Sequence, residues 1–216
     1  MRTKNIPDVF KSEDTVYHYC KLNTAVEHIL HKKQLRLSHR KRANDPIETV
    51  PPFFFNSSGR FKSESKRAIS KRRSLNEIIR KNALNRIDNT KQICLCKNDL
   101  SKIASPYDIF PKEEYYGFLK PRMWDQYADR YRGVCLAFSL EKLKQEASSF
   151  INGPVEYLEY HMLELNNHNI DELQIERVGV DNYWTSYSKR IEQIMFRKHK
   201  DYEGENEYRF LSFTEN

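Results

Sequence analysis

The stretch VCLAFS at residues 134–139 is the clearest strand signal in the chain, because it is a near-continuous apolar run of strand length. Gly133 precedes it and ends a helical stripe that the spacing predicts over Met123 to Arg132. Further strands are predicted on either side of this core, at residues 16–19, 35–38, 93–96, 155–160 and 207–212, and one or two helices over residues 171–200. Strands and helices interleave without strict βαβ regularity, so we expect one mixed α+β domain over residues 1–216.

Two capping boxes of the form Ser/Thr-x-x-Glu predict helix starts at Thr24 and Ser74. Between them, residues 51–73 lose any regular period, and we interpret them as an inserted basic loop with a partly helical segment. Residues 1–90 carry 20 Lys and Arg against 9 Asp and Glu, within a chain of net charge +7. Clustered cations neutralise phosphates, so a polyanion is a candidate partner, although a solvated basic surface is an equally simple explanation. The cations expected to contact nucleic acid are Lys62, Lys66, Arg67, Lys71, Arg72 and Arg73.

The most distinctive polar pattern lies near the C-terminus, where Glu205, Glu207 and Arg209 alternate with other residues. In a strand, residues two apart share a face, so these three side chains should project together while Tyr208 and Phe210 enter the core. A guanidinium beside two carboxylates suits a site that stabilises positive charge and handles a proton. The simpler alternative is a solvated edge strand with surface charges.

A second candidate is the stretch from Tyr17 to Cys20, in which His18 shares a strand face with Cys20. A strand histidine is more often a hydrogen-bonded core residue, and a Cys–His couple needs a third orienting group. The stripe containing Trp124 and Tyr127 is more often core than a stacking surface. The four cysteines fit neither a zinc ribbon nor a disulfide framework, so we expect reduced thiols in the cytoplasm and no metal site. No signal peptide or membrane-spanning segment is expected.

The chain resembles a large bacterial family of domains of unknown function over residues 17–210. The resemblance rests on four stretches: YHYCKLNTAVEHIL, LRLSHRKRANDPIE, MWDQYADRYRGVCLAFS and FRKHKDYEGENEYRF. Its most specific elements are Asn44-Asp45-Pro46, the Met123-Trp124-x-x-Tyr127-Ala128 helix with Gly133, and Glu205-x-Glu207-x-Arg209. The sequence departs from the family at Tyr202, where Trp is expected, and in the cationic insertion of residues 51–73.

The opening motif, an aromatic residue and His followed by a helix, looks like that of ADP-ribosyltransferases, especially the DarT type that modifies nucleic acid. This resemblance implies a split sheet flanked by helices, NAD as the substrate, and Glu207, or Glu205 if a bulge intervenes, as the catalytic carboxylate. It implies that His18 binds the ribose and that Cys20 takes the place of a hydroxyl group. The full set of residues expected to contact NAD is Tyr17, His18, Tyr19, Cys20, Arg36, Asn44, Tyr127 and Arg209.

The leading hypothesis is therefore an NAD-dependent ADP-ribosyltransferase, a bacterial toxin or antiphage effector that modifies nucleic acid. We expect RNA rather than DNA as the acceptor. A toxin of this kind would have a neutralising antitoxin as a protein partner. Two alternatives stay open: a non-catalytic nucleic-acid-binding module, and a metal-dependent nuclease that uses Asp45, Glu48, Glu205 and Glu207.

Overall fold

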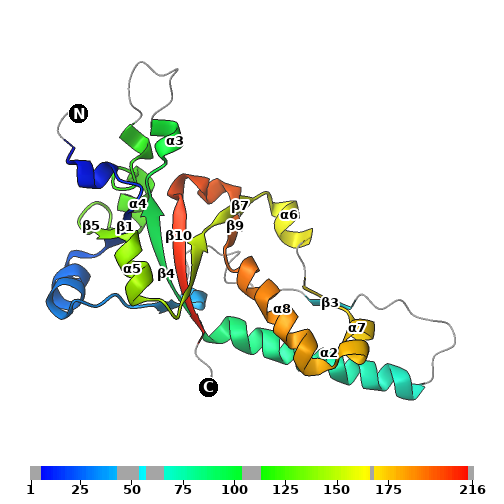
Figure 1. The fold of residues 1–216 in the computed structure, drawn as a ribbon. Helices are drawn as coiled ribbons and strands as arrows, with labels where there is room; N and C mark the ends of the chain where they lie inside the picture. The colour runs from blue at the N-terminus through cyan, green and yellow to red at the C-terminus, as the bar shows by residue number, and fades with distance from the viewer. Residues whose placement is uncertain (1–5, 43–53, 57–65, 104–112, 166–167, 214–216) are drawn as a thin grey trace. The chain divides into compact units, whose positions relative to one another are not determined.

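The computed structural model describes residues 6–42, 54–56, 66–103, 113–165 and 168–213 (Figure 1). The predicted α+β class is confirmed, since an antiparallel sheet and flanking helices make up the described chain. Contacts divide the chain into two compact units, each assembled from separate segments. Unit 1 comprises Met1–Ser38, Lys91–Val155 and Asp201–Ser212, and unit 2 comprises His39–Thr90, Glu156–Lys200 and Phe213–Asn216.

Unit 1 is built on a six-stranded sheet with the order β5-β1-β4-β10-β6, in which β2 also pairs with β4. Tyr17 lies opposite Cys96 in β4 and opposite Ala137 in β5, and both pairings of β1 are antiparallel. The strands are β1 (Thr15–Cys20), β2 (Ser38–His39), β4 (Thr90–Lys97), β5 (Val134–Ser139), β6 (Ile151–Pro154) and β10 (Glu207–Phe213).

The predicted strands are largely confirmed, with three differences. The strand expected at residues 35–38 is only β2, because Leu35 and Leu37 instead pack against the core as a connecting segment. The strand expected at residues 155–160 is the shorter β7 (Glu156–Leu158), and β6, which precedes it and pairs with β10, was not predicted. Finally, β5 lies at the edge of the sheet, so its side chains are half-buried rather than fully buried.

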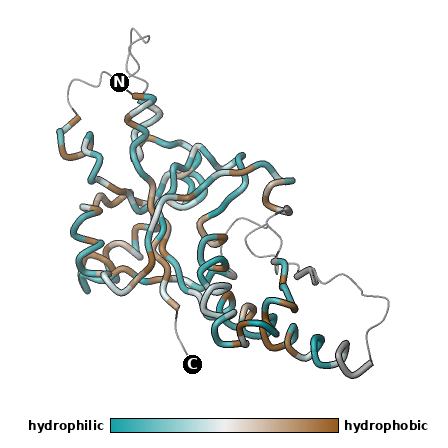
Figure 2. The backbone as a smooth tube through the Cα atoms, turned by 45° about the vertical axis from the view of Figure 1, so that its right-hand side comes forward, coloured by the Kyte–Doolittle hydropathy of each residue, from teal (hydrophilic) through white to brown (hydrophobic). Residues whose placement is uncertain are grey.

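Side-chain alternation gives the sheet of unit 1 two different faces. One face, called the apolar face here, packs Val16, Leu95 and Phe210 into a single core cluster. The other, called the charged face, packs Tyr17 and Tyr19 of β1 with Cys96 of β4, and it also carries Glu207 and Arg209. Hydrophilic and hydrophobic segments alternate along the chain in Figure 2, as expected for strands whose two faces differ.

Helices cover both faces of this sheet. The π-helix η3 (Thr24–Leu30) and α5 (Leu140–Glu146) lie on the apolar face, and α4 (Pro121–Gln126) lies on the charged face. The cap of η3 is Asn23, whose side chain accepts from the Thr24 backbone, so the predicted cap at Thr24 is wrong by one residue. The remaining helices of unit 1 are η2 (Asp8–Lys11), α3 (Leu100–Ile103), η5 (Glu113–Tyr115) and η6 (Lys200–Glu205).

The helix predicted over residues 123–132 begins near the expected position but ends at Gln126. The chain then takes left-handed backbone angles at Asp129, Arg130 and Tyr131, with φ of 49°, 54° and 66°, and these angles are incompatible with a continuing helix. Gly133 is required by space, because a Cβ there would lie 2.3 Å from the Cys20 carbonyl oxygen. A tight loop therefore replaces the last turns of the predicted helix.

Unit 2 is mainly helical. Its long helix α2 packs against α7 and α8, and the buried residues Tyr183, Tyr187 and Ile191 line the inner side of α8. Two short parallel strand pairs, β3 with β8 and β7 with β9, complete the unit. The elements are η4 (Arg40–Arg42), β3 (Phe54–Asn56), α2 (Lys66–Asn89), α6 (Tyr160–Leu165), β8 (His168–Ile170), α7 (Glu172–Val178), α8 (Val180–Ile194) and β9 (Arg197–His199).

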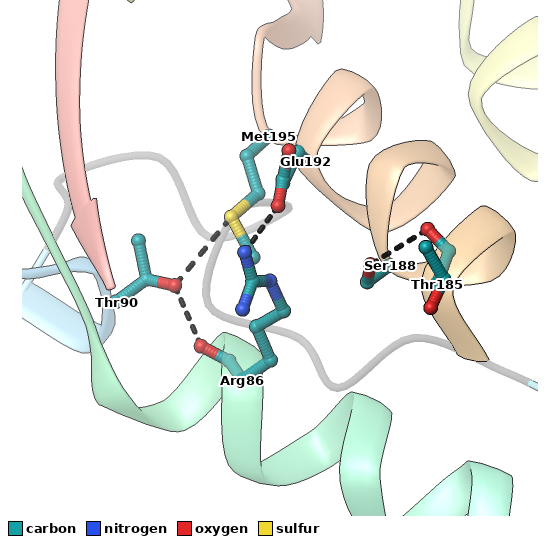
Figure 3. A network of polar contacts seen from close by, with 6 residues as sticks. All are labelled: Arg86, Thr90, Thr185, Ser188, Glu192 and Met195. Atoms are coloured by element: carbon teal, nitrogen blue, oxygen red, sulfur yellow. Dashed lines mark hydrogen bonds and ion pairs between the residues drawn. The ribbon is translucent and has the colours of Figure 1, made fainter. Parts of the chain in front are cut away.

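Polar contacts fasten α2 to α8, as Figure 3 shows. Arg86 pairs with Glu192, and the Thr90 hydroxyl donates to the Arg86 carbonyl at 2.6 Å. The helix start predicted at Ser74 is wrong, because α2 begins at Lys66 and runs through this position without a break. Ser74 bonds back to the Ser70 carbonyl at 3.2 Å instead of capping a new helix. No helix among the described residues is both long and apolar enough to cross a membrane.

Candidate functional site

A buried ion pair on β10 is the centre of the candidate site. The Arg209 guanidinium donates from Nε to Glu207 Oε1 at 2.5 Å and from Nη2 to Glu207 Oε2 at 3.0 Å. Glu207 is 4% exposed and Arg209 is fully buried, because β10 lies inside the sheet between β4 and β6. The alternative of a solvated edge strand is therefore wrong. The predicted alternation is confirmed, since Tyr208 and Phe210 lie in the core of the apolar face.

Glu205 lies in the same region as Glu207, but it is not part of the strand in which it was expected. It is the last residue of η6, and Asn206 with a φ of 45° separates it from the start of β10. Strand alternation therefore does not place Glu205 beside Glu207. Glu205 is nevertheless 3% exposed, and both carboxylates act electrostatically on the Cys96 thiol. The two glutamates thus lie in one buried neighbourhood.

Lys120 joins this cluster and was not predicted from the sequence. Its ammonium group donates to the Gly204 carbonyl at 2.7 Å, and its side chain is buried. Burial lowers the pKa of Lys120, while electrostatic interactions with Cys96, Asp99 and Glu205 oppose that shift. Nothing in the local sequence marks Lys120, because its burial depends on the distant Gly204 carbonyl.

Cys96 lies among these charged groups on β4. Burial raises the pKa of its thiol, and the nearby Lys120 charge opposes this while those of Glu205 and Glu207 add to it. A fully buried thiol with a raised pKa is a poor nucleophile. The cluster therefore offers carboxylates and cations rather than a reactive cysteine.

Aromatic side chains cover the charged face beside this cluster. Tyr19 meets Trp124 edge to face with ring centroids 5.3 Å apart, and Tyr127 packs in the same group. The Tyr19 hydroxyl donates to the Gly117 carbonyl at 2.6 Å, and the Tyr17 hydroxyl donates to the Phe10 carbonyl at 2.7 Å. Burial raises the pKa of Tyr17 to about 12 and raises that of Tyr19 as well. These tyrosines thus form an aromatic layer on the same face of the sheet as Glu207.

His18 and Cys20 lie on the opposite face of the sheet. Cys20 packs with Ala25 and Ile29 of η3, and His18 faces the same way because it is two residues earlier in β1. Burial lowers the pKa of His18, while a hydrogen bond to the Cys94 backbone opposes that shift. The predicted roles of His18 and Glu207 at one NAD site require both to face the same cleft, and they do not. Their side chains project from opposite faces of the sheet, so the sheet lies between them.

The other predicted site residues are dispersed. Arg36 is exposed in unit 1, and Asn44, Asp45 and Glu48 lie outside the described residues. Among the described residues, no group of three or more His, Cys, Asp and Glu side chains is arranged to hold a metal ion.

The residues predicted to contact nucleic acid differ in their solvent exposure. Arg72 is half-buried and forms an ion pair with Glu176 at 3.3 Å. Lys71 and Arg73 are exposed on α2. Lys62 lies outside the described residues, as do the side chains of Lys66 and Arg67, although the latter two residues belong to α2.

Comparison with known proteins gives a match to a family model. No curated protein and no solved structure matches the chain. The matching family model is described as a protein of unknown function (DUF2971), and it covers a narrower stretch than the predicted resemblance over residues 17–210. The matched stretch begins within α4 and ends within β10, the strand that carries Glu207 and Arg209. Residues 123–210 thus match the DUF2971 family of unknown function, which confirms the predicted resemblance for that part of the chain.

Proposed function

We propose that this chain is an NAD-dependent ADP-ribosyltransferase that acts on nucleic acid, with Glu207 as its catalytic carboxylate. The observation that supports this proposal is the buried Glu207–Arg209 pair, which lies in the interior of the sheet with Glu205 and Lys120 nearby. Burying four ionisable side chains opposes folding, and such clusters occur preferentially at functional sites.

The chemistry follows from where positive charge develops. In ADP-ribosyl transfer the bond between nicotinamide and the ribose C1′ breaks, nicotinamide leaves with the bonding electrons, and the acceptor forms a new bond to C1′. The ribose carries positive charge in between, and a fixed carboxylate in a water-poor setting stabilises that charge. Glu207 supplies the carboxylate, and the two hydrogen bonds from Arg209 hold it in one orientation.

The role of the ribose-binding histidine is not carried over in this proposal. His18 lies on the apolar face, so it does not share a site with Glu207. Tyr17, Tyr19 and Tyr127 were expected to contact NAD and do lie on the charged face. Tyr17 and Tyr19 are buried, so the half-buried Tyr127 is the candidate for the aromatic wall of a nicotinamide site.

The test is transfer of label from radiolabelled NAD to bacterial RNA, DNA and protein. We expect labelling by the unmodified chain and none by the double variant Glu207→Leu, Arg209→Met, which removes both charges together and so avoids an isolated buried charge. Glu203→Gln is the matched control, because Glu203 is an exposed glutamate of η6, the segment that precedes β10. Full activity in the double variant, or no labelling of any fraction by the unmodified chain, contradicts the proposal.

A second candidate function is nucleic-acid binding without catalysis, and the outer surface of α2 favours it. Lys71, Arg73, Arg80 and Lys81 are exposed on this helix, against the exposed acids Glu77 and Asp88. The exposed Arg42 lies on η4, which contacts α2. Cations grouped in this way bind phosphates without reading sequence.

Salt dependence of binding tests this second function. Replacing Lys71, Arg73, Arg80 and Lys81 by Gln should reduce the slope of log affinity against log salt by about 3 for single-stranded RNA, at about 0.7 per phosphate contact. The control replaces Lys21, Lys32, Arg130 and Lys142, which are exposed cations of unit 1. An equal loss of slope in both variants contradicts a specific role for α2.

A further inference from the structure

Unit 1 contains a cavity of about 620 Å³ on the apolar face of its sheet, on the other side from Glu207. Its floor is formed by strand residues, including Ile93 and Leu95 of β4 and Phe210 of β10. One wall comes from η3 and the segment after it, and the opposite wall comes from α5 and the turn that follows. The size and the apolar lining are those of pockets that bind small molecules.

The polar groups of the cavity are few and differ between its two walls. Among the described residues, its lining includes only Lys33, Gln34 and Glu146 as polar side chains, and all three are exposed at the surface. The η3 wall carries one exposed acid, Glu27, against the exposed cations Lys32, Lys33 and Arg36. The α5 wall balances two lysines with two glutamates. The field at the cavity is therefore positive on the η3 side.

The backbone around the cavity has two unusual features, and both lie on the η3 wall. Residues Thr24–Leu30 form a π-helix, a rare conformation that is frequent at functional sites. Lys33 has a left-handed φ of 52° at a position after a helix where glycine is normally preferred. Glycine would fit this backbone conformation with less strain, so Lys33 is a position where a substitution can be tested without loss of the fold.

The exposure of Leu30 also indicates that the cavity binds a ligand. It lines the cavity and yet is 60% exposed, so a large apolar side chain faces solvent at the mouth. A bound molecule with an apolar body would cover it.

We propose that this cavity binds a small amphiphile with an aliphatic body and one anionic head, such as a long-chain carboxylate. The aliphatic chain occupies the space above Ile93, Leu95 and Phe210, and the head lies at the mouth, where Lys33 donates to it. The site is independent of Glu207, so its failure would leave the transferase proposal untouched, and the reverse also holds.

The test is calorimetric titration of the whole chain with saturated carboxylates of increasing length, each below its micelle concentration, beside alcohols of the same length. Each added methylene should tighten binding by up to about fourfold until the cavity is full. At equal length the carboxylate should bind about tenfold more tightly than the alcohol, as expected for one charge-assisted hydrogen bond.

Two variants make the assignment specific. Lys33→Gly should weaken binding of the carboxylate to that of the alcohol, while it raises the urea midpoint because glycine fits the left-handed backbone. Leu30→Gln replaces an exposed side chain, so the fold is retained, and it should weaken both ligands alike. The proposal is overturned if no carboxylate binds, or if affinity is independent of chain length. It is also overturned if Lys33→Gly leaves carboxylate affinity unchanged. Tighter binding of the alkyl amine of the same length would likewise overturn it, because Glu146 would then bind the head group.

Discussion

The Glu207–Arg209 pair makes the strongest prediction about stability. Glu207→Gln keeps the size of the side chain but removes the negative charge beside a guanidinium that has no solvent exposure. Removing one partner of a buried ion pair costs about 3–5 kcal/mol, since the buried guanidinium loses the charge that was paired with it. A domain typically has about 5–15 kcal/mol of stability, so this one atom change should remove a large share of it.

The assay is urea unfolding followed by circular dichroism, in which the midpoint should fall while the slope m stays constant. Glu156→Gln is the matched control, because Glu156 pairs with Arg197 at 2.9 Å but its side chain is 58% exposed. That change should cost at most about 1 kcal/mol. The double variant Glu207→Leu, Arg209→Met should recover most of the stability lost in the single variant. If Glu207→Gln costs no more than Glu156→Gln, the pair is not energetically buried and the reasoning fails.

Two further predictions concern the fold of unit 1. Burial lowers the pKa of His18, so the folded state favours the neutral imidazole. The free energy of unfolding is therefore unaffected by this group above its ordinary pKa of 6.5. It decreases as pH falls from 6.5 toward the lowered folded pKa, because the unfolded chain takes up the proton first. His18→Leu should therefore flatten the pH dependence of the urea midpoint between pH 7.5 and 5, and an unchanged slope would contradict the burial of His18. Gly133→Ala should cost about 1–3 kcal/mol, because its Cβ would lie 2.3 Å from the Cys20 oxygen and 2.8 Å from the Ala128 Cα, both of them backbone atoms. Gly204→Ala, whose Cβ meets nothing within 4 Å, should leave the same midpoint nearly unchanged, and equal effects of the two changes would show that the close approach at Gly133 does not matter.

Local patterns predicted most of the elements that position the candidate site. The period of two in the final strand correctly places Glu207 and Arg209 on one face and Tyr208 and Phe210 on the other. The apolar run at residues 134–139 correctly predicts β5. Two local patterns gave wrong helix boundaries. The Ser-x-x-Glu pattern at Ser74 lies in the interior of α2 and not at a helix start. The helical spacing of aromatic residues continues past Gln126, where α4 ends.

The sequence by itself determined which side chains of each strand point the same way, because alternation is a property of the backbone within one strand. Only the tertiary structure decided that β1, β4 and β10 lie side by side and in which register. That pairing puts Tyr17 and Tyr19 on the face of Glu207 and His18 on the other. It also buries Lys120 against Gly204, 84 residues away, and opens the cavity between η3 and α5. Contacts of this kind join distant segments, so no local period in the chain encodes them.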